Sequence, residues 1–382
     1  MCINIVPFEE LFEWQNKSSL KARLGKQAGK YCFFICSDTV VKRFDEYLIN
    51  KEALIFGTGG KASIHYCNQP FAYSTDCAVA CKKNDNIILK YIYYYFRQKN
   101  LRILQDGFKG SGLQHISKSI IGKIAVPVPP LEEQRRIVAK IEELFSLLES
   151  GTESLQKAKG QLAAYRQAVL KEAFADVATY GSLGEIIEQP KYGTSKKCSY
   201  SQTEKSFPVF RIPNIYYKNG NISHTDLKFA DFSNNELSRI DLKENDILII
   251  RSNGSVSLVG RAAIIRPIDT KATFAGYLMR IRLKNTSKVK AKYLYYYLES
   301  CKARLYIENV AKSTSGVHNI NSDEVKHLSI PLCDETEIQN TVSYIESRLS
   351  VCDNVEKTIE TALEKSEALR QSILRQAFEG GL

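Results

Sequence analysis

The nonapeptide RQAVLKEAF at Arg166–Phe174 returns as RQSILRQAF at Arg370–Phe378, and this pair decides the fold. Around it, residues 127–174 and 331–378 align without a gap at a constant offset of 204 positions. The matched positions include Pro127/Pro331, Glu133/Glu337, Val138/Val342, Ile141/Ile345, Glu142/Glu346 and Ser146/Ser350. A register held over this length indicates an internal duplication, which can present two equivalent faces to a partner with a matching repeat.

The duplication extends upstream of these segments. KYIYYYF at residues 90–96 matches KYLYYYL at 292–298, and GSGLQHIS at 110–117 matches TSGVHNIN at 314–321. Earlier still, each half is richer in β-branched and aromatic residues interrupted by Gly, Asn and Asp, which is typical of strands joined by tight turns. Each half is therefore predicted to be an α+β globule followed by a helical arm.

Both copies carry apolar residues at alternating spacings of three and four, which predicts long amphipathic helices. The first stripe runs from Ile137 to Phe174, about 57 Å at 1.5 Å per residue. Its seam positions are Ile141, Leu144, Leu148, Leu155, Leu162, Tyr165 and Val169; the second copy has Val342, Ile345, Leu349, Cys352, Ile359, Ala362, Leu369 and Ile373, followed by Gly380 and Gly381 as helix terminators. We expect the two stripes to bury against each other, as in a coiled-coil pair.

Length and charge narrow the class of protein. A chain of 382 residues favours two globular domains. The net charge of +11, from 53 Lys and Arg against 42 Asp and Glu, favours polyanions such as nucleic acid or an anionic membrane surface. No apolar run is long enough to span a bilayer, and MCINIVPFEELFEW lacks the basic and apolar regions of a secretion signal. A cytoplasmic protein with reduced thiols is expected.

Catalytic and metal-binding motifs are scarce. The sequence has no P-loop, H-E-x-x-H, G-x-S-x-G, or N-P-P-Y or D-P-P-Y motif, and the glycine-rich segment 56–61 lacks the G-x-G-x-x-G pattern of a nucleotide site. Cys32 with Cys36, and Cys77 with Cys81, form C-x3-C pairs, but apolar strand-like residues separate them. We interpret these cysteines as small buried hydrophobes, with a zinc site as the alternative.

Three polar segments of the second half have the chemistry of DNA contacts. KYGTSKK at residues 191–197 offers Lys for phosphates and hydroxyls for base edges, and IRSNGS at 250–255 is expected to present Arg and Asn on a β-turn. The loop 312–318 combines glycine, hydroxyls and a basic entry. Ordinary solvated loops and turn chemistry are the alternatives. The candidates are Lys191, Tyr192, Thr194, Ser195, Lys196, Lys197, Arg251, Ser252, Asn253, Ser255, Lys312, Ser315 and His318.

The first half has equivalent segments at residues 17–23, 56–61 and 109–115. Their candidate residues are Lys17, Ser18, Ser19, Lys21, Arg23, Thr58, Lys61, Lys109, Ser111, Gln114 and His115. The tyrosine runs at 93–95 and 295–297 could stack on bases, but on a short helix they are more often part of a core.

Taken together, PVPPLEEQRRIVAKIEELF at 127–145, RQAVLKEAF and their weaker second copies resemble the specificity subunits of type I restriction-modification systems. The resemblance covers essentially the whole chain. It implies two α/β target-recognition domains alternating with two long antiparallel helices that form a coiled-coil spacer, related by a pseudo-twofold repeat. The implied bounds are 1–126 and 179–330 for the recognition domains, and 127–178 and 331–382 for the spacers.

The resemblance also implies a function. The chain would be no enzyme by itself; each recognition domain would read one half of a bipartite, asymmetric DNA site, with the helices fixing the gap. Two methylation subunits binding S-adenosylmethionine, and restriction subunits using ATP and Mg, would assemble on it. In FRIPNI at 210–215, the resemblance adds Arg211 and Asn214 to the candidates.

The first domain departs from the second, because Ile35 and Gly57 stand where the second has Arg211 and Arg251. The first half-site therefore cannot be read by analogy. The competing hypothesis is a helical adaptor that assembles proteins and binds DNA only through non-specific charge. A fused methyltransferase or nuclease would need the catalytic motifs that the sequence lacks.

Overall fold

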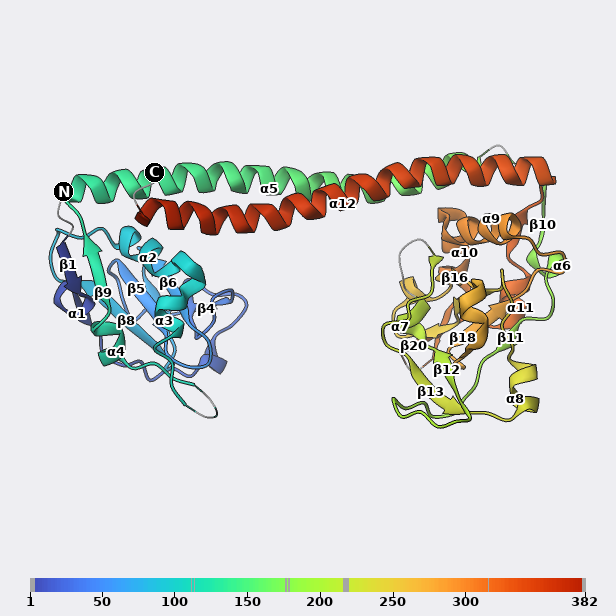
Figure 1. Ribbon diagram of the computed structural model, residues 1–382, viewed down its shortest axis with the longest axis horizontal. Coiled ribbons are helices and arrows are strands. Elements are labelled where there is room, and N and C mark those ends of the chain that lie inside the picture. The colour runs from blue at the N-terminus through green and yellow to red at the C-terminus, as the bar shows by residue number, and fades with distance from the viewer. Residues whose placement is uncertain are drawn as a thin grey trace. The chain divides into compact units, whose positions relative to one another are not determined.

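The computed structural model describes residues 4–110, 112, 114–175, 177, 179–215, 220–314 and 316–379, with only the backbone at 99–100 and 312–314 (Figure 1). It divides into two compact units. Unit 1 comprises Met1–Lys157 with Ile359–Leu382, and unit 2 comprises Ala158–Thr358. Each unit thus combines one mixed α/β globule with parts of both long helices.

Unit 1 contains a four-stranded antiparallel sheet in the order β2 (Phe12–Trp14), β8 (Cys77–Lys82), β5 (Ala53–Gly57), β6 (Ser63–Cys67). In a second sheet, β3 (Tyr31–Phe34) lies between antiparallel β4 (Val41–Phe44) and parallel β7 (Phe71–Tyr73). The remaining elements are the antiparallel pair β1 (Asn4–Pro7) and β9 (Ala125–Val128), and the helices α1 (Phe8–Leu11), α2 (Leu89–Arg97), α3 (Arg102–Gln105) and α4 (Lys118–Gly122).

Unit 2 repeats this plan. Its four-stranded sheet has the order β11 (Lys191–Tyr192), β18 (Leu278–Ile281), β14 (Ile247–Ile250), β16 (Ala262–Ile264), and in its second sheet β12 (Ser206–Phe210) lies between β13 (Lys228–Asp231) and the parallel β17 (Thr273–Phe274). The other elements are the pair β10 (Tyr180–Ser182) and β21 (Ser329–Pro331), and the helices α6 (Leu183–Ile186), α7 (Ile212–Ile215), α8 (Asn234–Arg239), α9 (Lys288–Glu299), α10 (Cys301–Val310) and α11 (Ser322–Lys326).

The two sheet topologies match strand for strand, which confirms the internal duplication predicted from the register of the repeat. Unit 2 also has a three-stranded sheet in which β20 (Val317–Asn319) lies between β15 (Ser252–Asn253) and β19 (Lys312–Thr314). At the corresponding place in unit 1, single bridges join His115 to Gly59 and to Lys109. In both units, main-chain pairing therefore joins the polar loops to one another.

The long helices are α5 (Leu131–Ala173) and α12 (Glu335–Glu379). Helix α12 begins at a reciprocal cap, in which Glu337 N donates to Asp334 Oδ1 at 2.8 Å and Asp334 N donates to Glu337 Oε2 at 2.9 Å. The expected terminators Gly380 and Gly381 lie outside the described residues.

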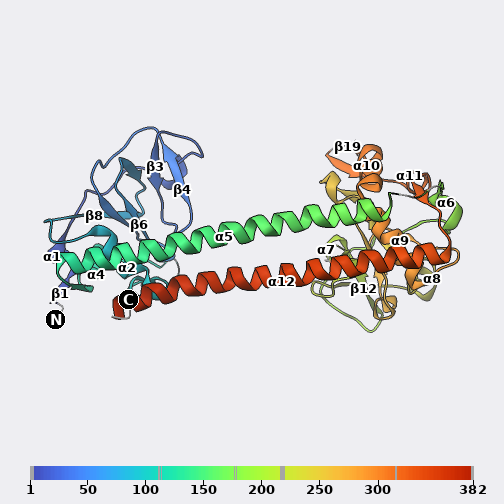
Figure 2. The same ribbon diagram turned by 90° about the horizontal axis from the view of Figure 1, so that it is seen from above.

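Within each unit, the segments of α5 and α12 lie side by side and antiparallel (Figure 2). In unit 1, Thr152 and Ser366 exchange a hydrogen bond of 3.1 Å, and in unit 2 Arg166 pairs with Asp353 at 2.7 Å. The predicted seam is correct for most positions but wrong for Tyr165 and Leu369, which are 44% and 50% exposed. A two-helix seam is narrow, so apolar residues at its margin stay in solvent.

Helices α2 and α9 carry the tyrosine runs, and each belongs to the hydrophobic core that joins the four-stranded sheet of its unit to the long helices. Phe378 packs on Tyr91 and Tyr95 of α2, with ring centroids 5.2 and 5.6 Å apart. In unit 2, Phe174 packs on Tyr293 and Tyr297 of α9 at 5.4 and 5.2 Å. The last residue of each repeated nonapeptide is thus an aromatic anchor, and the tyrosines are core residues.

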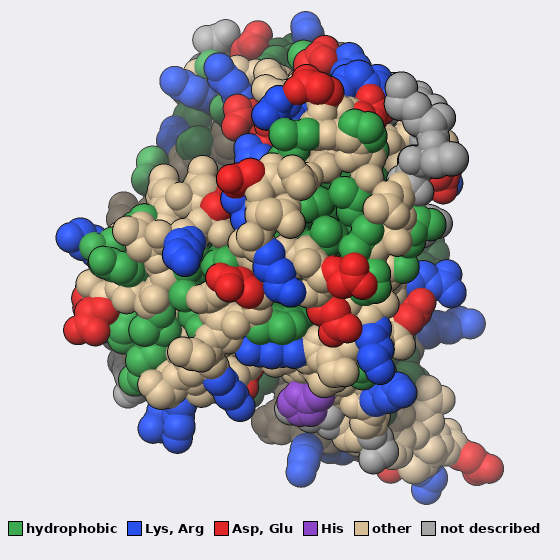
Figure 3. Space-filling view, turned by 90° about the vertical axis from the view of Figure 1, so that its left-hand side faces the viewer, with side chains coloured by type: hydrophobic (Ala, Val, Ile, Leu, Met, Phe, Trp, Pro, Cys, Tyr) green, Lys and Arg blue, Asp and Glu red, His purple; other side chains and the backbone are tan. Residues whose placement is uncertain are grey.

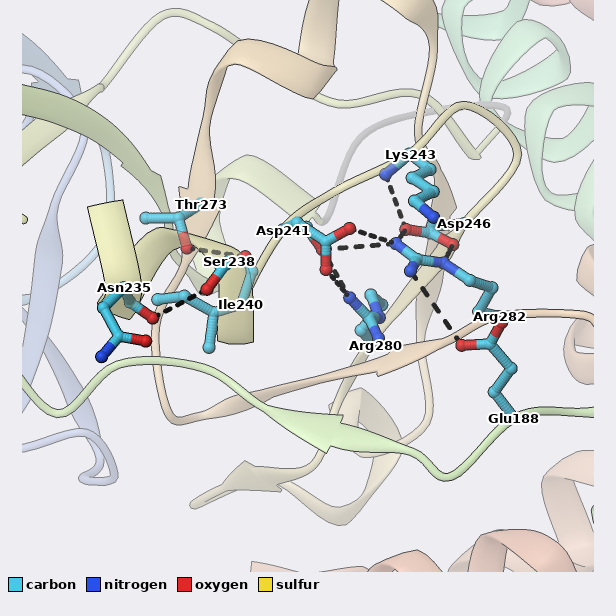
Figure 4. A network of polar contacts seen from close by, with 10 residues as sticks. All are labelled: Glu188, Asn235, Ser238, Ile240, Asp241, Lys243, Asp246, Thr273, Arg280 and Arg282. Carbon is cyan, nitrogen blue, oxygen red and sulfur yellow. Dashed lines mark hydrogen bonds and ion pairs between the residues drawn. The ribbon is translucent and has the colours of Figure 1, made fainter. Parts of the chain in front are cut away.

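A buried network of charges holds β18 to the segment before β14 (Figure 4). Arg282 donates to both carboxylate oxygens of Asp246, at 2.7 and 2.6 Å, and Asp246 is 1% exposed. Arg280, also 1% exposed, donates to Asp241 Oδ1 at 2.7 Å. Burial opposes ionisation of Asp241, but the hydrogen bond from Arg280 and the charge of Arg282 hold its pKa below the usual value.

Cys32, Cys77 and Cys81 pack in one cluster of apolar side chains. Cys77 and Cys81 on β8 are buried, Cys32 and Cys36 are half-buried, and burial raises the pKa of Cys77 to about 12. Among the described residues, no group of His, Cys, Asp and Glu has the arrangement of a metal site. The described helices include none with the length and apolarity that crossing a membrane requires.

Candidate nucleic-acid interface

In unit 2, main-chain hydrogen bonds bring the predicted DNA-contact segments together. Gly276 N donates to Thr194 O at 2.7 Å, and Arg251 N donates to Tyr277 O at 2.9 Å. Ile320 N then donates to Arg251 O at 2.9 Å. The segments 191–197 and 251–255 therefore flank the turn 275–277, and segment 317–320 lies on the other side of 251–255. We call these four segments the unit 2 loop cluster.

Two candidate side chains of this cluster contact each other directly. The guanidinium carbon of Arg251 lies 4.4 Å from the ring centroid of Tyr192, and Arg251 Nη1 donates to Gly276 O at 3.2 Å. The Tyr192 hydroxyl accepts from Ser322 N at 3.0 Å, which fixes the ring. Arg251 is half-buried and positioned by an aromatic face, which is a suitable arrangement for a planar donor that must present itself in one orientation.

The segment after β14 differs from its expected form. The sequence predicts a β-turn tip at 250–255, but Ser252 and Asn253 pair as strand β15 with Asn319 and His318 of β20. The bend comes one step later, where Asn253 Oδ1 accepts from Ser255 N at 2.8 Å. The turn prediction was wrong because a distant strand pairs with these residues, and local sequence carries little signal for such pairing.

Unit 1 has the same set of main-chain hydrogen bonds between its segments, and we call this set the backbone frame. Thr75 N donates to Leu20 O at 2.8 Å, Thr58 N donates to Asp76 O at 2.9 Å, and Ile116 N donates to Thr58 O at 3.1 Å. Segments 17–23, 58–61, 74–76 and 114–116 thus form a unit 1 loop cluster. Gln114 O and Gly60 N are also joined, at 2.8 Å.

This frame corrects one predicted correspondence and confirms another. Thr58 makes the bonds that Arg251 makes in unit 2, so Thr58, and not Gly57, stands where the second unit has Arg251. The repeat alignment was one residue out because the strands of the two units are joined by turns of different length. Ile35 does correspond to Arg211, because each directly follows a strand, β3 in unit 1 and β12 in unit 2. In both units, the last carbonyl oxygen of that strand accepts a main-chain hydrogen bond of 2.9 Å from the residue after the neighbouring parallel strand, β7 or β17.

A thiol stabilises the unit 1 turn. Cys36 Sγ accepts from Gly59 N at 3.3 Å and donates to Gly59 O. A Cβ on Gly59 would meet the His115 ring at 3.2 Å, so the two segments approach closely there. His115 Nδ1 also lies 3.2 Å from Thr58 O. This turn is therefore held by the side chains of Cys36 and His115, whereas Arg251 contacts the turn in unit 2.

Most of the basic candidates lie on the surface. Those exposed are Lys17, Lys21, Arg23, Lys61, Lys109, Lys191, Lys196 and Lys197. Lys196 also has internal partners, since its ammonium lies 2.7 Å from Glu236 Oε1 and lowers the pKa of Glu236 to about 2. Arg211 Nη2 pairs with Asp226 Oδ2 at 2.7 Å and holds the pKa of Asp226 below its usual range. Both therefore also stabilise their own loops.

Other candidates are distributed as follows. Exposed at the surface are Ser19, Gln114, His115, Tyr192, Ser195 and Ser255, whereas Thr58, Thr194, Ser252, Asn253 and His318 are half-buried. Ser111 and Ser315, and the side chain of Lys312, lie outside the described residues.

Two candidates lie below the surface. Asn214 is 1% exposed; its Oδ1 accepts from Arg211 N at 2.8 Å and its Nδ2 donates to Ser223 O at 3.0 Å. Ser18 is 7% exposed, and its Oγ accepts from Leu20 N at 3.0 Å. Because these polar groups hold their own loops in place, neither residue remains in the proposed interface.

Sequence reasoning missed two exposed residues of the clusters, Asp76 in unit 1 and Tyr277 in unit 2. Each stands in the turn before β8 or β18, at the same position of the frame, and Tyr277 is 62% exposed. Neither belongs to a polar run that the sequence would single out. For Tyr277, the available sequence signal was an aromatic residue directly before the strand-like stretch Leu278–Ile281.

The charges over the face seen in Figure 3 are mixed. Lys and Arg side chains are interleaved there with Asp and Glu, with hydrophobic side chains between them (Figure 3). An interleaved field of this kind attracts phosphate less than a uniform basic one.

Comparison with known proteins gives a consistent family. Residues 3–159 and 176–365 match the family model "Type I restriction modification DNA specificity domain". The specificity subunit of the type I restriction enzyme EcoKI from Escherichia coli K12 is 27% identical over 291 residues, which cover 72% of this chain and 61% of that protein. The EcoDI specificity subunit of Escherichia coli is 24% identical over 397 residues, covering 95% and 85%. The chain thus spans about three fifths of the EcoKI relative.

Solved structures show the same fold. One from a study of complex assembly and conformational transition of a type I restriction-modification system has a TM-score of 0.75 at 17% identity, covering 99% of this chain and 98% of that one. The HsdS subunit of Thermoanaerobacter tengcongensis has a TM-score of 0.57 at 17% identity, covering 99% and 97%. These likenesses confirm the predicted architecture of mixed α/β domains and long helices.

Proposed function

Because this chain belongs to the type I restriction modification DNA specificity family, we propose that it reads a bipartite, asymmetric site on double-stranded DNA. In this proposal residues 1–126 and 179–330 are the two recognition domains, and residues 127–178 and 331–382 are helical spacers. The chain itself would recognise DNA, and chemistry would belong to other subunits.

The observation that carries the proposal is the pair of loop clusters. The same hydrogen-bond frame recurs in both units, yet the frame holds Thr58 in one and Arg251 in the other. A shared scaffold with different side chains at matched positions is what two different half-sites require, because base edges are distinguished by the donors and acceptors that meet them. Exposed lysines around each cluster would bind phosphates and set the orientation.

The proposed partners follow from the family. Two methylation subunits that use S-adenosylmethionine would bind the chain, and restriction subunits that use ATP and Mg would join them. In this proposal, partner subunits would cover apolar side chains that the long helices expose, such as Leu147 at 65% and Val351 at 60%.

A salt-dependence experiment separates this proposal from the adaptor hypothesis. The chain with its methylation subunits should bind DNA containing its methylation motif about a thousandfold more tightly than scrambled DNA at the same ionic strength. The ratio should persist when salt weakens both affinities. Equal affinity for the two DNAs at every salt concentration would favour the adaptor.

A further inference from the structure

Asp76 holds a defined place at the edge of the unit 1 loop cluster. Its carbonyl oxygen accepts two hydrogen bonds from Thr58, one from the main-chain N and one from Oγ1, both 2.9 Å long. The side chain of Asp76 is exposed, and its nearest hydrogen-bonding contact is Thr75 Oγ1, at the limiting distance of 3.5 Å. The backbone is therefore held firmly while the carboxylate faces solvent beside the turn 58–61.

A carboxylate at this place has a cost if the cluster binds DNA. Phosphates repel it, and two exposed lysines indicate that phosphates come close: Lys61 of the cluster, and Lys109, whose main chain pairs with that of His115. One class of DNA group compensates for this repulsion, namely the exocyclic amino group of a base in the major groove. Asp and Glu accept hydrogen bonds from cytosine N4 in this way.

The matched position in unit 2 carries no carboxylate. Tyr277 replaces Asp76 and is 62% exposed, and the neighbouring Arg251 contributes only donors. Arg251 suits the acceptors O6 and N7 of guanine. The two hydrogen-bonded positions of the frame thus carry Thr58 and the acceptor Asp76 in unit 1, and the donor Arg251 and Tyr277 in unit 2.

We propose that Asp76 determines specificity in the first half-site by accepting a hydrogen bond from the exocyclic amino group of a base, cytosine N4 in the first instance. In unit 2, Tyr277 takes the place of Asp76 and Arg251 takes the place of Thr58. This inference rests on the proposed function, and it assigns the difference between the half-sites to the side chains at these two matched positions.

The test is a selection from randomised duplex DNA by the full chain with its methylation subunits. The wild type should select an amino-bearing base at one position of the first half-site, and Asp76→Ala should reduce that preference about tenfold or more. Preferences in the second half-site should stay unchanged. Tyr277→Ala should do the reverse, altering the second half-site alone.

The matched control is Asp85→Asn. Asp85 lies beyond the other end of β8, is 93% exposed and pairs with Lys82 at 2.8 Å. Its replacement removes one negative charge from the same unit and should leave every base preference intact. Asp76→Leu removes both acceptor oxygens with little change of size, so it decides the matter if Asp76→Ala binds no DNA.

Wild-type preferences at every position in Asp76→Leu, or in a binding-competent Asp76→Ala, would overturn the inference. Failure of the proposed function has a different signature, since the wild type itself would then select no two-part sequence.

Discussion

At the scale of single residues, the contacts of Arg251 explain how a flexible side chain could discriminate a base. Its guanidinium is stacked 4.4 Å from the Tyr192 ring centroid and bonded to Gly276 O. Arg251 has therefore already lost on folding part of the side-chain entropy that it would otherwise lose on binding DNA.

Replacing Arg251 with Ala should lower discrimination at one position of the second half-site by about 1–3 kcal/mol, because a bidentate contact to a base would be lost. Arg251→Lys keeps the charge but not the planar fork, so it should retain most general affinity and still lose discrimination. Competition binding with single-base variants of the site measures both. An equal loss on all sequences would contradict a role in base reading.

Asp241 makes the stability of unit 2 depend on pH in the acid range. Its folded-state pKa is below the ordinary value of 3.8 in spite of burial, because Arg280 and Arg282 stabilise the carboxylate. Its contribution to stability is thus fully present above about pH 4 and is lost as the pH falls through the folded-state pKa.

The wild type should therefore exceed Asp241→Asn in free energy of unfolding at about pH 7, and this difference should shrink below about pH 4. Urea unfolding of both proteins over this range provides the measurement. A difference independent of pH would mean that the carboxylate charge contributes nothing to the fold.

At the scale of elements, the helices were predictable and the loop clusters were only partly so. The repeat and the apolar spacing predicted both long helices, since these are local patterns. The pairing of Ser252 and Asn253 with Asn319 and His318 was missed because it joins segments far apart in the chain. Burial of Asn214 could not be predicted from the sequence either, because an amide side chain can hydrogen-bond to a base or to the main chain of a buried turn.

The anchors at the ends of the repeated nonapeptides allow a matched comparison. Phe174 is 7% exposed and contacts two tyrosine rings of α9, whereas Phe378 is half-buried and contacts two of α2. Phe174→Ala should cost about 3–5 kcal/mol of unfolding free energy, and Phe378→Ala less, because less apolar surface is lost. Chemical denaturation of both variants measures this, and an equal or larger cost at Phe378 would contradict the packing described.

At the scale of the whole molecule, the duplication separates what must be the same from what must differ. The sheets, the aromatic anchors and the backbone frame of the loop clusters are shared by the two units. The side chains at matched positions of the frame differ, with Thr58 and Asp76 in one unit and Arg251 and Tyr277 in the other. A pseudo-symmetric protein of this kind is suited to a site with two unlike halves.

The most direct test of this account is methylome sequencing of cells that produce the chain together with its methylation subunits. We predict methylated bases in one asymmetric motif of two specified parts separated by a gap of fixed length and unspecified sequence. A continuous motif, a palindrome, or no motif that depends on this chain would contradict the account.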